Sequence, residues 1–287
     1  MILLLWALSW PMLTLGADSP SHLPRTLFLA SEDSLPHQQA YAPLRQGLSH
    51  PAPLFVAITS PEAQHWLHHF DCHQCLIITS GPAALKKTLE TTRQAQVLSI
   101  MITMNQHQQL LQHLDHNERF AALFMDLPLT QRLEIAKQHI PMLRQFTMVT
   151  SPQDQAHRMD WPDNLTVFIH DPKQHLLEPF IHAARHGDAI VTQPDRDIYN
   201  AKTLISIMMT TYRLGIPLIG HSEALHRAGA MLSIYADPEM LGKEALALLR
   251  EQAPYTTQPL PQRHTTRYQV VINHQMARSL QIHVETP

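Results

Sequence analysis

The amino-acid sequence predicts an α/β protein built as two doubly wound parallel-sheet lobes. Short, continuous apolar runs recur along the chain, which is typical of strands buried on both faces of a sheet. Amphipathic segments separate these runs, and such alternation predicts parallel strands covered by helices on both sides. About eleven strands are expected, which is more than one parallel sheet comfortably holds, so two lobes are predicted.

The predicted strands are the apolar runs at 26–30, 54–58, 75–79, 97–102, 120–125, 146–150, 165–170, 188–192, 217–220, 231–235 and 268–272. Residues 60–62 and 237–239 each place a capping residue, a proline and an acid at a helix start. A helix is predicted over 131–140, with Leu133, Ala136 and Ile140 on its apolar face. Residues 250–262 contain three prolines and no periodicity, which predicts an extended linker.

Composition limits the classes of protein and partner. The 287 residues, 44% of them hydrophobic, can fill two sizeable cores. The formal net charge is only -3 and the lysines and arginines form no cluster, so no nucleic-acid partner is expected. The even spacing of apolar runs argues against fibrous and disordered classes. The 21 histidines are the one unusual count.

The first residues are typical of an export signal. Residues 1–16 form one apolar run without charge, followed by a small residue, Ala17. The run is shorter than a membrane-spanning helix and suits a secretory signal, so residues 1–17 are predicted to be a signal peptide. An uncleaved anchor is the alternative. We expect a periplasmic protein.

Ligand-binding residues are expected at strand ends, because ligands of parallel α/β sheets bind where the strands lead into helices. The loop at 79–83 follows a strand and opens a helix, so its N–H groups either bind an anion or form an ordinary helix cap. Asp195 is the strongest candidate as a charge at a strand end, with a solvated turn as the alternative. The candidate ligand-binding residues are Ser31, Ser80, Gly81, Asn105, Asp126, Gln193, Asp195, His221 and Ser222.

Sequence motifs for catalysis and cofactors are missing from the chain. It contains no Walker loop, no dinucleotide fingerprint, no HExxH and no GxSxG. We therefore expect no enzyme, no catalytic residues and no cofactor.

The two cysteines lie in a histidine-rich segment at 65–75. Cys72 and Cys75 are predicted to form a structural disulfide, since an exported chain meets an oxidising compartment. In the metal alternative both thiolates bind the ion together with His68, His69 or His73. In the redox alternative the pair exchanges disulfides, but such motifs open a helix after a strand, whereas this one precedes a strand.

The C-terminal third resembles a known family. The stretches at 216–222, 228–235 and 237–245, and the ending at 270–280, resemble the ABC-transporter substrate-binding family that includes tryptophan and tyrosine transporter binding proteins. Two departures fall where the family binds its ligand: Ser80-Gly81 replaces glycine-threonine, and Met104-Asn105 replaces Asp-Pro. Amino-acid specificity is therefore not carried over.

The resemblance implies a type I periplasmic-binding-protein fold with a ligand cleft between its two lobes. It also implies a protein that binds a small solute and serves a membrane permease or a membrane sensor. One lobe is expected to comprise residues 23–118 and 231–253, and the other 119–230 and 254–287. The alternative function is a periplasmic metal-handling or redox protein that uses Cys72, Cys75 and the neighbouring histidines.

Overall fold

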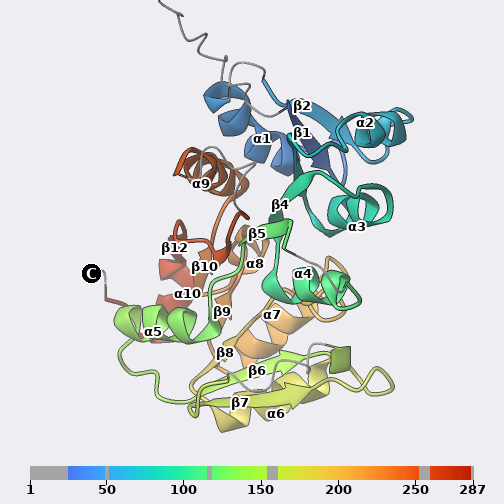
Figure 1. Ribbon diagram of the computed structural model, residues 1–287. Helices are drawn as coiled ribbons and strands as arrows, with labels where there is room; N and C mark the ends of the chain where they lie inside the picture. The colour runs from blue at the N-terminus through green and yellow to red at the C-terminus, as the bar shows by residue number, and fades with distance from the viewer. Residues whose placement is uncertain (1–24, 49–51, 115–117, 154–160, 252–258, 286–287) are drawn as a thin grey trace, which may run out of the picture.

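The computed structural model describes residues 25–48, 52–114, 118–153, 161–251 and 259–285, which form two α/β lobes stacked end to end (Figure 1). The predicted signal peptide at 1–17 and residues 252–258 of the predicted linker lie outside this part of the chain. Within it, no helix is long and apolar enough to cross a membrane.

Sheet A organises the first lobe, and all its strand pairs are parallel. Its strand order is β11-β5-β4-β3-β1-β2. The strands are β1 (Arg25–Ala30), β2 (Leu54–Ala57), β3 (Cys75–Ser80), β4 (Gln96–Ile102), β5 (Phe120–Phe124) and β11 (Gln262–His264). The helices of this lobe are α1 (Leu35–Gly47), α2 (Ala63–His69), α3 (Pro82–Thr91), α4 (Met104–Leu111) and α9 (Pro238–Glu251).

Sheet B organises the second lobe in the order β12-β10-β9-β8-β6-β7. Its strands are β6 (Phe146–Thr150), β7 (Leu165–Ile169), β8 (Ala189–Val191), β9 (Leu218–Gly220), β10 (Leu232–Tyr235) and β12 (Gln269–Ile272). Only the β10–β12 pair is antiparallel among its described pairs. The helices are α5 (Leu129–His139), α6 (Leu177–His186), α7 (Leu204–Arg213), α8 (Glu223–Ala228) and α10 (His274–Ser279).

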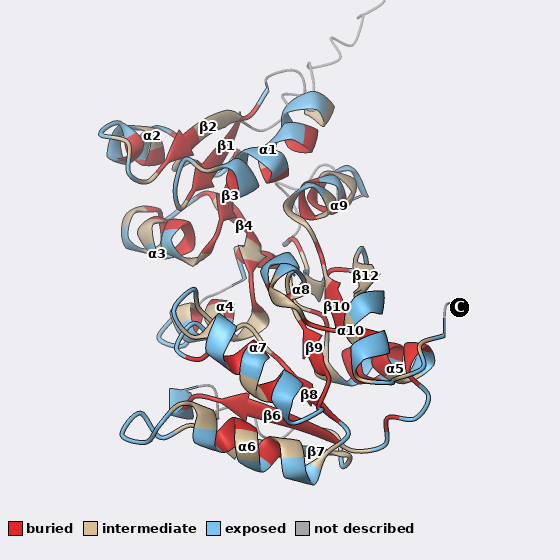
Figure 2. Ribbon diagram, turned by 180° about the vertical axis from the view of Figure 1, so that it is seen from behind, coloured by how far each residue is buried: buried red, intermediate tan, exposed pale blue. Residues whose placement is uncertain are grey.

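Helices cover both faces of each sheet, as the continuous apolar strands predict (Figure 2). Side chains of α1 and α9, such as Leu44 and Leu248, pack on one face of sheet A, and α2, α3 and α4 cover the other. In the second lobe α5 and α10 pack on one face of sheet B, and α6, α7 and α8 on the other. Each lobe therefore has its own hydrophobic core.

The lobe boundaries differ from those predicted at three strands. β5 pairs with β4 and β11 pairs with β5, so both belong to the first lobe, whereas they were predicted in the second. β10 pairs with β9 and β12 and so belongs to the second lobe rather than the first. The chain therefore passes from one lobe to the other at 125–128, 236–237 and 265–268. For β5 and β10 the apolar run predicts a buried strand, but the sheet that the strand joins is decided by long-range pairing that the run does not encode. β11 is polar and lies outside the predicted apolar runs.

Candidate functional site

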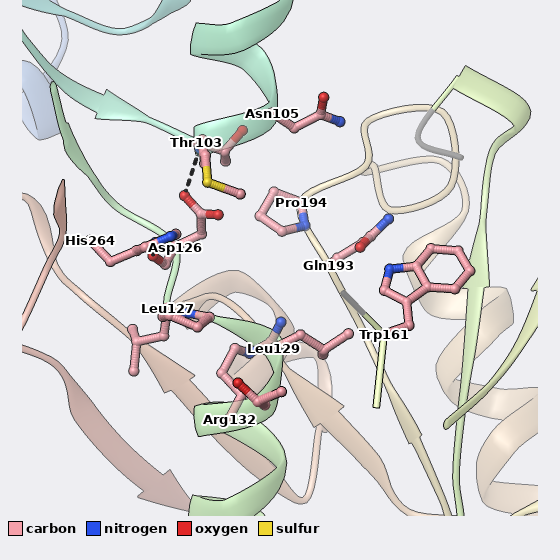
Figure 3. Close-up of a pocket in the computed structure, with 13 residues that line it drawn as sticks. Thr103, Asn105, Asp126, Leu127, Leu129, Arg132, Trp161, Gln193, Pro194 and His264 are labelled. Carbon is pink, nitrogen blue, oxygen red and sulfur yellow. Dashed lines mark hydrogen bonds between the residues drawn. The ribbon is translucent and has the colours of Figure 1, made fainter. Parts of the chain in front are cut away.

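A pocket of about 390 Å³ lies between the lobes, beside two of the crossings (Figure 3). Its size is within the range of small-molecule sites. The first lobe contributes Thr103, Met104, Asn105 and His264, and the crossing after β5 contributes Asp126, Leu127 and Pro128. The second lobe contributes Leu129, Thr130, Arg132, Trp161, Gln193 and Pro194. Most of these residues follow β4, β5 and β8 or lie at the crossings, so the pocket lies at the carboxyl edges of both sheets. Leu129, Thr130 and Arg132 come from α5, and Trp161 precedes β7.

Asp126 is fixed at the crossing after β5. Its Oδ1 accepts a hydrogen bond from the backbone N–H of Met104 at 3.0 Å, in the first turn of α4. The carbonyl oxygen of Asp126 accepts from Nδ1 of His264 at 2.6 Å. Burial raises the pKa of the Asp126 carboxyl, although the Met104 N–H, His264 and Arg132 act in the opposite direction. The carboxyl is therefore protonated more readily than an exposed aspartate.

Arg132 brings a buried positive charge to the pocket from α5. Its side chain is 4% exposed, and its Nη2 donates to the carbonyl oxygen of Thr192 at 2.5 Å. The Nε is buried without a hydrogen-bond partner. Burial lowers the pKa of Arg132 to about 10, so the guanidinium stays charged near neutral pH.

Gln193 and His221 each line a cavity together with Arg132. Gln193 lines the pocket, and its Nε2 donates to Oγ1 of Thr150 at 2.8 Å. His221 lies behind the pocket, in a small cavity that Arg132 also borders, and its Nδ1 is 2.7 Å from Oγ1 of Thr192. Burial, together with the charge of Arg132, holds the pKa of His221 well below its ordinary value, so the ring is neutral.

Ser31, Ser80 and Gly81 form a closed cluster instead of lining the pocket. Oγ of Ser31 accepts from the Ala84 N–H at 3.0 Å at the start of α3, and Oγ of Ser80 lies 2.7 Å from Nδ1 of His37. Gly81 has φ +89°, and a Cβ there would lie 2.6 Å from the Ser31 Oγ. The loop is thus packed against the first lobe, with its hydroxyls engaged internally.

Asp195 and Ser222 also serve their own turns. The carboxylate of Asp195 accepts from the Ser151 N–H at 2.8 Å and the Asp197 N–H at 3.0 Å, and its side chain is buried. Oγ of Ser222 accepts from the Leu225 N–H at the start of α8. Neither residue is among those that line the pocket. The structure therefore brings Asn105, Asp126 and Gln193 of the predicted set together in the pocket and places the others around it.

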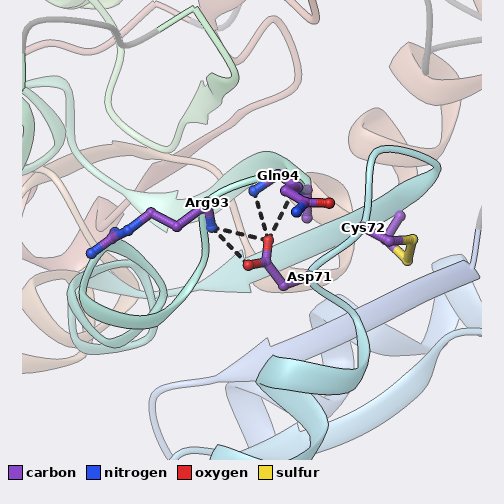
Figure 4. Close-up of a disulfide and its surroundings, with 6 residues drawn as sticks. Asp71, Cys72, Arg93 and Gln94 are labelled. Carbon is purple, nitrogen blue, oxygen red and sulfur yellow. Dashed lines mark hydrogen bonds between the residues drawn. A yellow bond between two sulfur atoms is a disulfide. The ribbon is translucent and has the colours of Figure 1, made fainter.

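The cysteine segment lies at the amino ends of the strands of sheet A, whereas the pocket lies at their carboxyl ends. Cys72 and Cys75 form the predicted disulfide at the start of β3, with Cα atoms 5.1 Å apart (Figure 4). Next to it, the Asp71 carboxylate accepts three backbone N–H groups, of which those of Gln94 and Arg93 are 2.7 and 2.9 Å away. Burial opposes ionisation, but these N–H groups lower the pKa of Asp71.

The structure of this segment does not support the alternative of a metal site. Both sulfurs are joined in the disulfide, so neither is a thiolate ligand. Across the described ranges, no group of three histidine, cysteine, aspartate or glutamate side chains is arranged to hold a metal ion.

Sequence reasoning missed Arg132, Thr103, Trp161 and His264. Arg132 lies inside the helix predicted for 131–140, four residues before Ala136 of the predicted apolar face. A charged residue on the predicted apolar face of this helix was the signal in the sequence that could have identified Arg132. Thr103 gave a second signal, since with Gln106 it forms a capping box at α4.

Comparison with known proteins supports the fold. Neither a family model nor a curated protein sequence matches the chain. Among solved structures, the ligand-free, open form of a substrate-binding protein with adhesive properties from Clostridium difficile is 11% identical, with a TM-score of 0.67 over 92% of this chain and 96% of that one. The ABC domain in complex with L-Trp from Streptococcus pneumonia is 15% identical, with a TM-score of 0.59 over 91% and 96%. A conserved domain protein from Vibrio cholerae is 13% identical, with a TM-score of 0.60 over 92% and 96%.

These similarities cover almost the whole of each chain but rest on low identity. They confirm the predicted fold, two parallel-sheet lobes of the type I periplasmic-binding-protein kind. Fold similarity alone assigns no ligand.

Proposed function

We propose that the protein binds a small polar solute between its lobes, as an exported solute-binding protein that serves an ABC-type transporter or an associated membrane sensor. The pocket between the lobes carries this proposal, because its lining combines polar groups of both lobes with apolar side chains. A solute there contacts both lobes and favours the arrangement in which both sets of contacts are made. The proposal assigns no chemical step to the pocket.

Two observations support export, and a third supports a membrane partner. The apolar run at 1–16 is typical of a secretory signal, and the Cys72–Cys75 disulfide suits an oxidising compartment. The family resemblance at 216–245 supports a permease or sensor as the partner. Cell fractionation and the N-terminal sequence of the mature protein test export, which predicts a periplasmic protein that begins near residue 18.

A thermal-shift screen of small polar solutes tests binding, because a ligand that binds only the folded state raises the melting temperature. The variant Asn105→Trp fills the pocket from the first turn of α4 and should abolish the shift. Gln109→Trp, one turn further along α4 and exposed outside the pocket, is the matched control and should keep it. A shift that survives in Asn105→Trp, or the absence of any shift, would contradict the proposal.

A further inference from the structure

A buried guanidinium without an anionic partner borders the pocket. None of the ion pairs in the described part of the chain includes Arg132. Its Nη2 is bonded to a neutral carbonyl oxygen, and its buried Nε has no partner. A buried charge is costly unless it is paired, so this arrangement lacks a negative group.

The titratable neighbours of Arg132 do not supply that group. His221 and Tyr199 are both neutral, because burial lowers the pKa of the histidine and raises the pKa of the tyrosine. Asp126 is the only neighbouring acid among the described residues that influences Arg132, and its Oδ1 is engaged by the Met104 N–H. Burial also raises the pKa of the Asp126 carboxyl, which makes its ionisation unfavourable.

The other residues that line the pocket indicate the chemical nature of the rest of the ligand. Trp161, Leu129 and Leu127 give the pocket an apolar surface beside Arg132. A planar guanidinium pairs best with a carboxylate, which it can bind through two parallel hydrogen bonds.

We propose that the solute is a small carboxylate with an apolar body, and that its carboxylate pairs with Arg132. This inference rests on the proposed solute-binding function and specifies the chemical class of the ligand. The apolar body lies against Trp161 and the leucines. The single negative charge of a carboxylate balances the single positive charge of Arg132.

The test compares matched pairs of probes on the full chain by thermal shift and calorimetry. The probes are butyrate, 4-methylpentanoate, phenylacetate and 3-phenylpropionate, each with its primary amide, together with phenethylamine, phenyl phosphate and every solute found in the screen above. We expect carboxylates to bind and their amides to bind at least about tenfold more weakly, since a charge-assisted hydrogen bond is lost.

Variants of Arg132 provide the second readout. Arg132→Met keeps most of the side-chain volume and should weaken carboxylate binding at least about tenfold, whereas Arg196→Met removes a charge from the exposed turn next to the pocket and should not. Without any ligand, Arg132→Met should melt no lower than the wild type, because it removes an unpaired buried charge. A markedly lower melting temperature, or failure to fold, would mean that Arg132 is a structural charge and would contradict the inference.

The outcomes separate this inference from the proposed function. Tight binding of amides, amines or other uncharged solutes, unaffected by Arg132→Met, would overturn the carboxylate assignment while leaving solute binding intact. Binding of phenyl phosphate in preference to the carboxylates would also overturn it, since a dianion brings one more negative charge than Arg132 balances. If no probe and no screened solute binds, both proposals fail.

Discussion

Two groups of strand-end loops in this protein look alike in sequence but differ in how their polar groups are satisfied. The cluster of Ser31, Ser80, Gly81 and His37 follows β1 and β3 and engages its hydroxyls internally. The pocket follows β4, β5 and β8 and leaves the Arg132 Nε without a partner. A position at the carboxyl edge of a sheet is therefore not enough to identify a ligand-binding residue. A buried polar group without a partner, on a residue that lines a cavity, is the stronger indication.

A substitution in the cluster of Ser31, Ser80, Gly81 and His37 should lower the free energy of unfolding. Gly81→Ala places a side chain at φ +89° and within 2.6 Å of the Ser31 Oγ, so we expect a loss of about 2–4 kcal/mol in the free energy of unfolding. Gly215→Ala is the control, because that glycine also has positive φ but nothing lies within 4 Å of the added Cβ. It should lose only about 1–2 kcal/mol. Urea unfolding measures both, and equal losses would show that the cluster is not tightly packed.

A substitution of Asp195 tests whether this buried acid at a strand end supports its own turn or binds the solute. Asp195→Ala leaves the buried Ser151 N–H without its acceptor, so the free energy of unfolding should fall by about 1–3 kcal/mol. Solute affinity of the folded variant should change less than about twofold, since Asp195 does not line the pocket. Calorimetry and urea unfolding separate the two effects. A large loss of affinity at unchanged stability would return Asp195 to the ligand site.

His107 extends the comparison to pH, because it lies on α4, whose first turn lines the pocket. Its Nε2 is buried without a partner, and burial lowers its pKa to about 4. A lowered pKa stabilises the folded state above the ordinary value near 6.5, and this contribution is lost as the pH falls from about 6.5 towards about 4. Between about pH 7 and pH 4.5 the free energy of unfolding should fall about 2 kcal/mol further in the wild type than in His107→Gln. Parallel pH profiles of the two proteins would contradict this.

The disulfide is expected to give the smallest effect, and neither of its cysteines lines the pocket. Cys72→Ala/Cys75→Ala opens a very short loop, so the free energy of unfolding should fall by about 1–2 kcal/mol. Solute affinity should not change. Reductant should destabilise the wild type by a similar amount and leave the double variant unaffected. Two freely alkylated thiols in protein purified without reductant would contradict the disulfide.

The sequence by itself determined the fold class, the cysteine pair and several pocket residues. Continuous apolar runs such as β3 are buried along their whole length, and burial on both faces is a local property that a run of side chains encodes directly. The short spacing of Cys72 and Cys75 is also local. Asn105, Asp126 and Gln193 were found because the ends of parallel strands can be located from the strands themselves.

Only the tertiary structure decided which sheet receives β5, β10 and β11, and which strand ends remain open. It also buried Arg132 against Thr192, 60 residues further along the chain, where a helix pattern alone allows an exposed arginine. These outcomes depend on contacts between segments far apart in sequence. The free energy of such contacts arises from packing and from the removal of water, and neither is encoded in any single segment.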